Sequence, residues 1–327
     1  MLKRRKFFQY AGLGSVGFLL ATRDGIASSM ENPALIQPDR QTLSDLKTFE
    51  FSVTTVDQAG QVKRRQTHTA KLFPEPLKGA EKLEMVAIAS GQFWMGASQN
   101  QSRSQGPTEG YDLPRHRVNL PSFFISKYPI TQAQWAAVAA LPQVQRPLDA
   151  APSHFQGRDR PVESISWLEA VEFCDRLSQH TGRRYQLPSE AQWEYACRAE
   201  TQTPFNVGET VTSQLANYVG TYTYKAESVG DYRQATVPVG SFSPNAFGLQ
   251  DMHGNVWEWC ADSWHHNYRG APTDGKAWVS AQRFPMRAIR GGSWLDAPVK
   301  TQSASRSGYF ETALNRTIGF RVSMASL

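Results

Sequence analysis

The sequence predicts a loop-rich α+β fold, with two or three helices and short antiparallel strands in a long irregular chain. Its 327 residues are 40% hydrophobic, which is enough for one sizeable core or two small ones. Helical periodicity is confined to three segments ending near Arg198, and strand-like alternation is brief. The 24 Gly, 19 Pro and 9 Trp residues indicate irregular loops held by aromatic side chains.

The composition excludes several classes of protein. The net charge is only +6, and no run of Lys or Arg follows Arg65, so we expect no nucleic-acid partner. Cys174, Cys197 and Cys260 are too few for a disulfide scaffold and form no CxxC pair. We therefore expect three small, buried, hydrophobic cysteines.

The first 29 residues have the layout of a signal peptide. A basic region at 3–6 precedes a short apolar stretch at 10–21 and small residues at 27–29. The paired arginines before Phe-Phe resemble a twin-arginine signal, which implies an exported protein in the periplasm or outside the cell. The alternative is the basic start of a cytosolic protein. The apolar stretch is too short and Gly-rich to cross a bilayer, so no membrane span is expected.

Residues 30–82 are expected to form a linker and a β-hairpin extension ahead of a main domain at 83–327. The segment at 30–46 is polar and contains Pro. Residues 48–56 alternate like a strand, and 62–72 read as the returning strand after a Gly-containing turn.

The main domain should open with two strands around a turn, at 85–88 and 91–96. A polar loop at 99–114 and a strand-rich stretch at 116–128 follow.

Capping signals place the three helices. Thr131 is a suitable N-cap for the first helix, and Ser189 begins the third. The second helix is the clearest, because Ser166 and Glu169 form a capping-box pattern and Gly182 lies just past its end. After this region helical periodicity stops, and brief strands are expected at 236–239, 288–291 and 319–323.

Several ordered motifs resemble the formylglycine-generating enzyme family, also called the sulfatase-modifying factor family. The longest is FGLQDMHGNVWEW at 247–259, and further matches lie at 85–88, 91–96, 128–135, 187–196, 290–294 and 319–321. The resemblance runs from about Leu83 to the C-terminus. It implies a variant of the C-type lectin fold in a single domain with little regular structure.

The resemblance also sets an expectation for chemistry. Family members oxidise a sulfatase cysteine to formylglycine with two cysteines that hold copper, a few residues after the Gly-Gly-Ser motif. Those positions fall here on Asp296 and Thr301, and neither offers the soft thiolate that Cu(I) prefers. We therefore expect no copper and no oxidase activity, although Ser293 and Trp257 match pocket residues of the family. A protein-modifying oxidoreductase that uses the same cleft remains the alternative.

The resemblance further implies structural calcium, which family members bind through loop oxygens. One predicted set is Asn217 and Asp231 with the carbonyls of Tyr218 and Arg233. The other is Asp251 and Glu258 with the carbonyls of Gly254 and Val256. The alternative for Asp251 and Glu258 is that they cap turns or pair with Arg.

The C-terminal segment has a second resemblance, to proteins that retroelements diversify in bacteria. In those proteins a Gly-Gly-Ser-Trp motif, a variable run with Ser-Ala-x-Arg and a final Ile-Gly-Phe-Arg occur in order, as they do here at 291–294, 303–306 and 318–321. Mutagenised Asn codons would yield the residues at Leu295, Asp296, Ala297, Val299, Ser305, Ser307, Gly308, Tyr309 and Phe310. Lys300 and Gln302 do not fit that set. The alternative is that ordinary sequence divergence within the family produced the residues that do fit.

This segment is predicted to be a binding face for an unidentified protein or small-molecule ligand. Exposed Tyr and Phe among small residues suit recognition, and alternation along a strand should expose at least one of the two adjacent rings at 309–310. The predicted ligand-binding residues are Trp294, Leu295, Asp296, Ala297, Val299, Lys300, Ser305, Ser307, Tyr309 and Phe310.

Overall fold

The computed structural model describes residues 46–98, 110–281, 283 and 285–325, which form an α+β domain as predicted. The signal peptide expected at 1–29 and nearly all of the linker lie outside the described residues. The helices are α2 (Gln132–Ala139), α3 (Trp167–Thr181) and α4 (Glu190–Arg198), with 3-10 turns η1 (Lys78–Ala80) and η2 (Pro298–Lys300).

The described strands form three sheets. The largest has the order β1 (Lys47–Val56), β2 (Val62–Pro76), β3 (Lys82–Ile88), β6 (Phe123–Ser126), β12 (Ser323–Ala325) and β7 (Tyr185–Gln186). The second has the order β10 (Arg306–Phe310), β9 (Met286–Arg290), β8 (Trp257–Ser263) and β11 (Ile318–Gly319). The third is the pair β4 (Gly91–Met95) and β5 (His116–Leu120).

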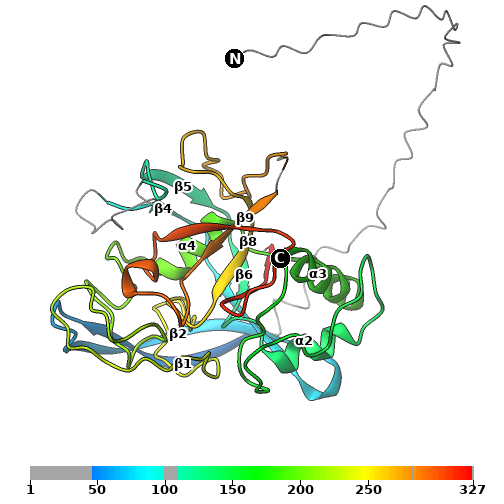
Figure 1. Ribbon diagram of the computed structural model, residues 1–327, viewed down its shortest axis with the longest axis horizontal. Coiled ribbons are helices and arrows are strands. Elements are labelled where there is room, and N and C mark those ends of the chain that lie inside the picture. Colours follow the sequence, from blue (N-terminus) through cyan, green and yellow to red (C-terminus); the bar gives the residue numbers. More distant parts are fainter. Residues whose placement is uncertain (1–45, 99–109, 282, 284, 326–327) are drawn as a thin grey trace, which may run out of the picture. The chain divides into compact units, whose positions relative to one another are not determined.

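The expected β-hairpin forms from β1 and β2, which are antiparallel from the Lys47–Leu72 pair to the Val56–Val62 pair (Figure 1). The C-terminal third of β2, from Leu72 to Pro76, also pairs with β3. The hairpin and the chain after residue 83 therefore share one continuous sheet.

All three helices begin at the predicted N-caps. Thr131, Ser166 and Ser189 each accept a hydrogen bond from the third residue of their helix, and that residue's side chain binds back to the cap. Gly182 ends α3 with φ of 72°, a left-handed conformation that glycine adopts without a Cβ clash. The capping hydrogen bonds are made within one turn, so residues close in sequence specify these helix ends.

The two opening strands predicted at 85–88 and 91–96 form as β3 and β4, in different sheets, because both edges of β3 are occupied by β2 and β6. Two other strand predictions needed correction. The run at 236–239 is not a strand, since Asn255 donates to and accepts from the Val237 backbone where a neighbouring strand would pair. The run at 319–323 divides into β11 and β12, which join different sheets.

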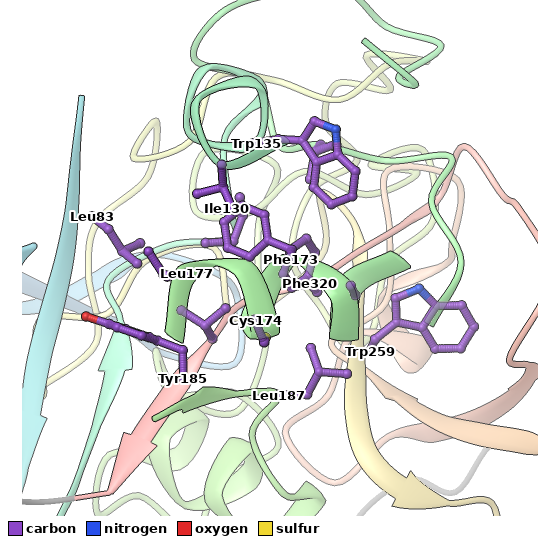
Figure 2. Packing of buried hydrophobic residues seen from close by; sticks show 14 of the residues in the cluster. Leu83, Ile130, Trp135, Phe173, Cys174, Leu177, Tyr185, Leu187, Trp259 and Phe320 are labelled. Atoms are coloured by element: carbon purple, nitrogen blue, oxygen red, sulfur yellow. The ribbon is translucent and has the colours of Figure 1, made fainter. Parts of the chain in front are cut away.

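The main core lies between α2, α3 and the sheets, and is built from aromatic rings (Figure 2). Trp135 stacks on Phe173 with ring centroids 5.6 Å apart, and Phe320 meets Phe173 edge-on at 5.1 Å. Such pairs contribute roughly 0.5–1.5 kcal/mol beyond the area they bury. Cys174 packs in this cluster, and Cys197 and Cys260 are also buried and free, which confirms their expected role as small hydrophobic residues.

Candidate functional site

A cleft of about 240 Å³ opens on the second sheet, beside the segment that follows the Gly-Gly-Ser motif. Gly291 and Gly292 have φ of 96° and 72°, and a Cβ on Gly292 would lie 2.6 Å from the Thr301 side chain. Only glycine fits this turn, which leads the chain from β9 towards the cleft. The cleft is lined by Trp257, Ile289, Ser293, Leu295, Asp296, Lys300, Ser307, Tyr309, Asn315, Thr317 and Ile318.

Asp296 is held by three donors on a single carboxylate oxygen. Its Oδ2 accepts from Trp257 Nε1 at 2.8 Å, from the Ser293 backbone N–H at 3.0 Å, and from the Ser293 hydroxyl. Burial raises the pKa of Asp296, and the donors from Ser293 and Trp257 oppose that rise. Among the described residues no donor reaches Oδ1, so this oxygen is the carboxylate's remaining acceptor.

Lys300 supplies the other charge in the cleft, from the end of η2. Burial lowers the pKa of its ammonium, and the carboxylates of Asp296 and Asp112 oppose that change. The cleft therefore carries one acidic and one basic group four residues apart in the chain.

Tyr309, on β10, is half-buried and also lines the cleft. Its ring lies 6.2 Å from that of Trp259, and its hydroxyl oxygen accepts a hydrogen bond from Asn315 Nδ2 at 3.0 Å. Asn315 is itself fixed, because its Oδ1 accepts from both the backbone N–H and the hydroxyl of Thr317. The hydroxyl of Tyr309 is thereby oriented by its neighbours.

The two expected thiolate positions have different environments. Asp296 lines the cleft, whereas Thr301 is fully buried, does not belong to the lining, and donates to the Pro298 carbonyl at 3.0 Å. Neither residue is a soft ligand, and the cysteines lie elsewhere in buried positions. The residues present do not fit the copper site that the family resemblance implies.

A second arrangement, Cys197 near His253, has the residue types of a nucleophile and base but not their electrostatics. The thiol lies 3.9 Å from His253 Nε2, which already accepts the Asn206 N–H at 3.0 Å. Burial raises the pKa of Cys197 to about 12 and lowers that of His253 to about 4. Both groups are neutral near pH 7, so this pair does not form a reactive thiolate.

The structure divides the predicted binding residues into three groups. Leu295, Asp296, Lys300, Ser307 and Tyr309 line the cleft, while Val299, Lys300 and Ser305 line a smaller cavity with Tyr111 and Arg306. Ala297 is partly exposed outside both, and Phe310 is 52% exposed, which confirms that one of the two adjacent rings faces outward.

Trp294 is the buried member of the predicted binding residues and anchors the segment at 294–310. It is 3% exposed, packs edge-on against Phe155 at 5.2 Å and donates from Nε1 to the Arg316 carbonyl.

Sequence reasoning missed four lining residues, Ile289, Asn315, Thr317 and Ile318. They come from β9 and from the chain around β11, which pairs in parallel with β8. The motif at 318–321 was a signal that this stretch matters, but the pairing that brings it to the cleft is not local in sequence.

The positions compatible with retroelement diversification share one property. Each of them is at least partly exposed, whereas Pro298, the stretch at 301–304 and Arg306 are buried. The segment from 295 to 310 thus alternates accessible side chains with anchoring ones.

Each predicted calcium set includes one buried oxygen that the described protein atoms leave without a partner. These are Oδ1 of Asn217 and Oδ1 of Asp251. Glu258 instead binds Arg321 through both oxygens and Trp193 through one. Asp231 is largely exposed, 3.8 Å from an Arg233 nitrogen. Among the described residues no cluster of three or more His, Cys, Asp or Glu is suited to a metal, so each set would need carbonyl or amide oxygens in addition to its carboxylates.

The remaining family-like motifs build the scaffold behind the cleft. Arg321 forms a bidentate pair with Glu258 at 2.6 and 2.8 Å, and Arg306 forms one with Glu190 at 2.6 Å on both arms. Arg290 pairs with Glu194 and lies over the Trp193 ring. Burial would raise the pKa of Glu190, but Arg306 and Arg290 hold it below its ordinary value. The pairs of Arg306 with Glu190 and of Arg290 with Glu194 tie α4 to the second sheet.

The described residues form a C-type lectin-like domain with a cleft on its second sheet. A family model described as the sulfatase-modifying factor enzyme 1-like domain matches residues 70–325, so the chain belongs to that family. This confirms the resemblance expected from the motifs, although the match begins inside β2, ahead of the boundary expected at residue 83.

Three relatives illustrate the similarity. The formylglycine-generating enzyme of Mus musculus is 28% identical over 296 residues, covering 73% of this chain and 74% of that enzyme. The serine/threonine-protein kinase Pkn1 of Chlamydia trachomatis serovar L2 is 27% identical over 270 residues, or 77% of this chain, but the chain spans only 39% of that kinase. The structure of PvdO from Pseudomonas aeruginosa aligns with a TM-score of 0.64 at 34% identity, covering 75% of this chain and 95% of PvdO.

No helix in the described part of the chain has the length and apolar character needed to cross a membrane.

Proposed function

We propose that this protein is an exported, non-oxidase member of the family that binds a small organic ligand in the cleft beside residue 296. The observation that carries the proposal is the anchored carboxylate of Asp296 in the cleft, at a position where the family resemblance implies a metal-binding thiolate. A carboxylate bound by three donors is a recognition group for a polar ligand, and it does not favour Cu(I).

The lining of the cleft supports this choice. Ile289, Ile318 and the Trp257 ring provide apolar surface, and a few polar groups converge on the same space. Small-molecule sites have this combination of apolar walls and few oriented polar groups. Leu295 remains 46% exposed while lining the cleft, so apolar surface extends to its edge.

A thermal-shift screen of the purified chain against a metabolite library tests the proposal. Ser307→Trp would fill the cleft, whereas Thr312→Trp places the same ring at an exposed position outside it. We expect at least one compound to raise the melting temperature of the wild type and Thr312→Trp, but not of Ser307→Trp, because a ligand that binds only the folded state stabilises it. Stabilisation that survives Ser307→Trp would mean that the compound binds outside the cleft. If the cleft bound only a protein partner and no compound, the ligand would be a protein and not a small molecule.

Export is the second part of the proposal and rests on residues 1–29. Replacing Arg4 and Arg5 with lysine in a fusion of this segment to a folded reporter should retain the reporter in the cytoplasm. Export of the double variant at the wild-type level would show that the paired arginines are not a twin-arginine signal.

Diversification of the face is a second candidate, favoured by the alternation of accessible and buried residues between 295 and 310. Sequencing the 3′ end of the gene in many isolates tests it. Diversification predicts that substitutions concentrate at the codons for the accessible positions and arise from adenines. An even spread of substitutions over buried and accessible codons would contradict it.

A further inference from the structure

We propose that the cleft is a proton-transfer site, in which Asp296 is the base and Tyr309 donates a hydrogen bond to the oxygen of a small carbonyl compound with an acidic C–H bond. The inference rests on the proposed ligand-binding function and deepens it by naming the class of ligand, an aryl-substituted 2-oxo acid. Three features of the cleft support the assignment: an acceptor, a donor and an apolar wall with one cation.

The acceptor is Oδ1 of Asp296. Because Oδ2 already accepts from Trp257 and from both groups of Ser293, the carboxylate is held in one orientation. Oδ1 receives no donor from the described residues, so the basic lone pairs of this group remain for the ligand. Burial raises the pKa of Asp296, which makes the carboxylate a stronger base than an exposed one.

The donor is the hydroxyl of Tyr309. Asn315 donates to its oxygen at 3.0 Å, and Thr317 occupies the only acceptor on the Asn315 amide. The Asn315 amide therefore donates to the Tyr309 oxygen but does not accept its hydrogen. The phenolic hydrogen of Tyr309 is directed away from Asn315. Since Tyr309 and Asp296 line the same cleft, that hydrogen is available to an oxygen of the same ligand.

The walls define the rest of the ligand. Ile289, Ile318 and the Trp257 ring suit a flat apolar group, and the Lys300 ammonium on the same lining favours a ligand that carries a carboxylate. An apolar surrounding also strengthens the hydrogen bond to developing negative charge. An aryl-substituted 2-oxo acid provides a ring, a ketone oxygen, a carboxylate and an acidic methylene group.

The step is a balanced isomerisation. Asp296 Oδ1 takes a proton from the carbon beside the ketone, and the C–H electron pair becomes the new C=C bond. The ketone π pair moves to its oxygen, where Tyr309 stabilises the negative charge. The protonated Asp296 returns the proton to that oxygen or to the carbon, so keto and enol forms interconvert without an oxidant or a reductant.

Phenylpyruvate is the probe, with the full chain as purified. Proton NMR in D₂O measures exchange of its methylene protons, and ultraviolet absorbance follows enol formation, each corrected for the buffer rate. We expect the wild type to accelerate both above buffer. Asp296→Asn keeps the size of the side chain and should reduce the rate about 10²- to 10⁴-fold, as expected for loss of a general base. Tyr309→Phe should reduce it about 10²-fold, as expected for loss of one oxyanion donor.

Two further variants separate catalysis from folding. Leu314→Ala removes an exposed side chain outside the cleft lining and should leave the rate unchanged. Asn315→Ala is the test of a positioning residue. It should lower the rate while the phenylpyruvate dissociation constant, measured by quenching of tryptophan fluorescence, stays constant. In the wild type the rate should rise with pH as Asp296 loses its proton, and this dependence should vanish in Asp296→Asn.

Some outcomes would overturn the proposal. Binding of phenylpyruvate without Asp296-dependent exchange would refute proton transfer and leave the ligand-binding function intact. Absence of both binding and exchange with phenylpyruvate and 4-hydroxyphenylpyruvate would refute the assigned class of ligand. Should Asp296→Asn fail to fold, full activity of Tyr309→Phe would still refute the mechanism.

Discussion

Single side chains decide which chemistry the cleft can perform. Asp296 offers a hard oxygen at a position where the family resemblance implies a soft thiolate, and the donors from Ser293 and Trp257 stabilise its negative charge. Ser293 and Trp257, which the family resemblance identified as pocket residues, therefore donate hydrogen bonds to a carboxylate in this protein.

The first prediction concerns copper. The purified protein should bind less than a stoichiometric amount of copper and should leave the cysteine of a sulfatase-motif peptide unoxidised, because Asp296 and Thr301 provide no thiolate. Elemental analysis measures the metal, and mass spectrometry measures the peptide. Formylglycine in the peptide would revive the alternative of a protein-modifying oxidoreductase.

The second prediction concerns His253, whose two ring nitrogens meet the Thr301 carbonyl and the Asn206 N–H. Burial lowers its pKa from 6.5 to about 4, so the folded state resists protonation more than the unfolded state does. The stability contributed by the neutral ring is complete above pH 6.5 and is lost as pH falls towards 4. Wild type should lose about 1.4 kcal/mol per pH unit in this window from this group alone.

The matched variant for that test is His253→Gln, which can donate to the Thr301 carbonyl and accept from Asn206 without titrating. Urea unfolding at several pH values gives the free energy of unfolding of both proteins. The difference between them should move in favour of the variant below pH 6.5. Parallel pH profiles would show that His253 titrates equally in the folded and unfolded states.

Secondary-structure elements differ in how far their own residues specify them. The capping signals at Ser166 and Ser189 predicted their helices because those hydrogen bonds are made within one turn. The strand expected at 236–239 failed because a distant side chain, Asn255, takes the backbone bonds of Val237. The cleft was predictable only in part for the same reason. Residues 293–310 are contiguous and could be identified as a segment, whereas the pairing of β11 with β8 joins residues far apart in the sequence.

The third prediction tests β10, where adjacent rings face opposite sides. Phe310 is 52% exposed, so Phe310→Ala should change stability by less than about 0.5 kcal/mol. Tyr309 packs near Trp259 and holds Asn315, so Tyr309→Ala should cost more, about 1–3 kcal/mol, although less than a fully buried ring. Denaturant unfolding of the two variants compares them directly. Equal costs would mean that β10 does not present one ring to the interior.

Across the whole domain, regular structure is sparse and stability depends on contacts that join distant loops. Buried arginines perform part of this role, since Arg321 connects Glu258 to carbonyls at Ser126 and Gln250. Asn255 joins the chain near 217 to that near 237 through its side chain. A divalent ion in the same loops would add a further connection of this type. The buried oxygens of Asn217 and Asp251 that lack a hydrogen-bond partner among the described residues are therefore the candidates to test as its ligands.

The last prediction is that calcium raises the melting temperature and that Asp251→Asn removes most of the effect. Asp251 Oδ2 accepts the Gly240 N–H at 2.7 Å, while Oδ1 is buried and receives no hydrogen bond from the described part of the chain. At a hundredfold excess over its dissociation constant, an ion that binds only the folded state adds about 2.7 kcal/mol. Asp251 is a better probe than Glu258, since Glu258→Ala would also leave Arg321 without its partner.

Asp262→Asn is the control, because it changes a buried carboxylate whose oxygens both accept backbone N–H groups, from Glu190 and Trp278. Calorimetry with calcium and with a chelator should show the same shift for this variant as for the wild type. Asn217→Ala tests the first set independently, since it removes the other unsatisfied oxygen. Equal melting temperatures with calcium and chelator in the wild type would refute both sets, whereas a shift that only Asn217→Ala abolishes would place the ion at the first.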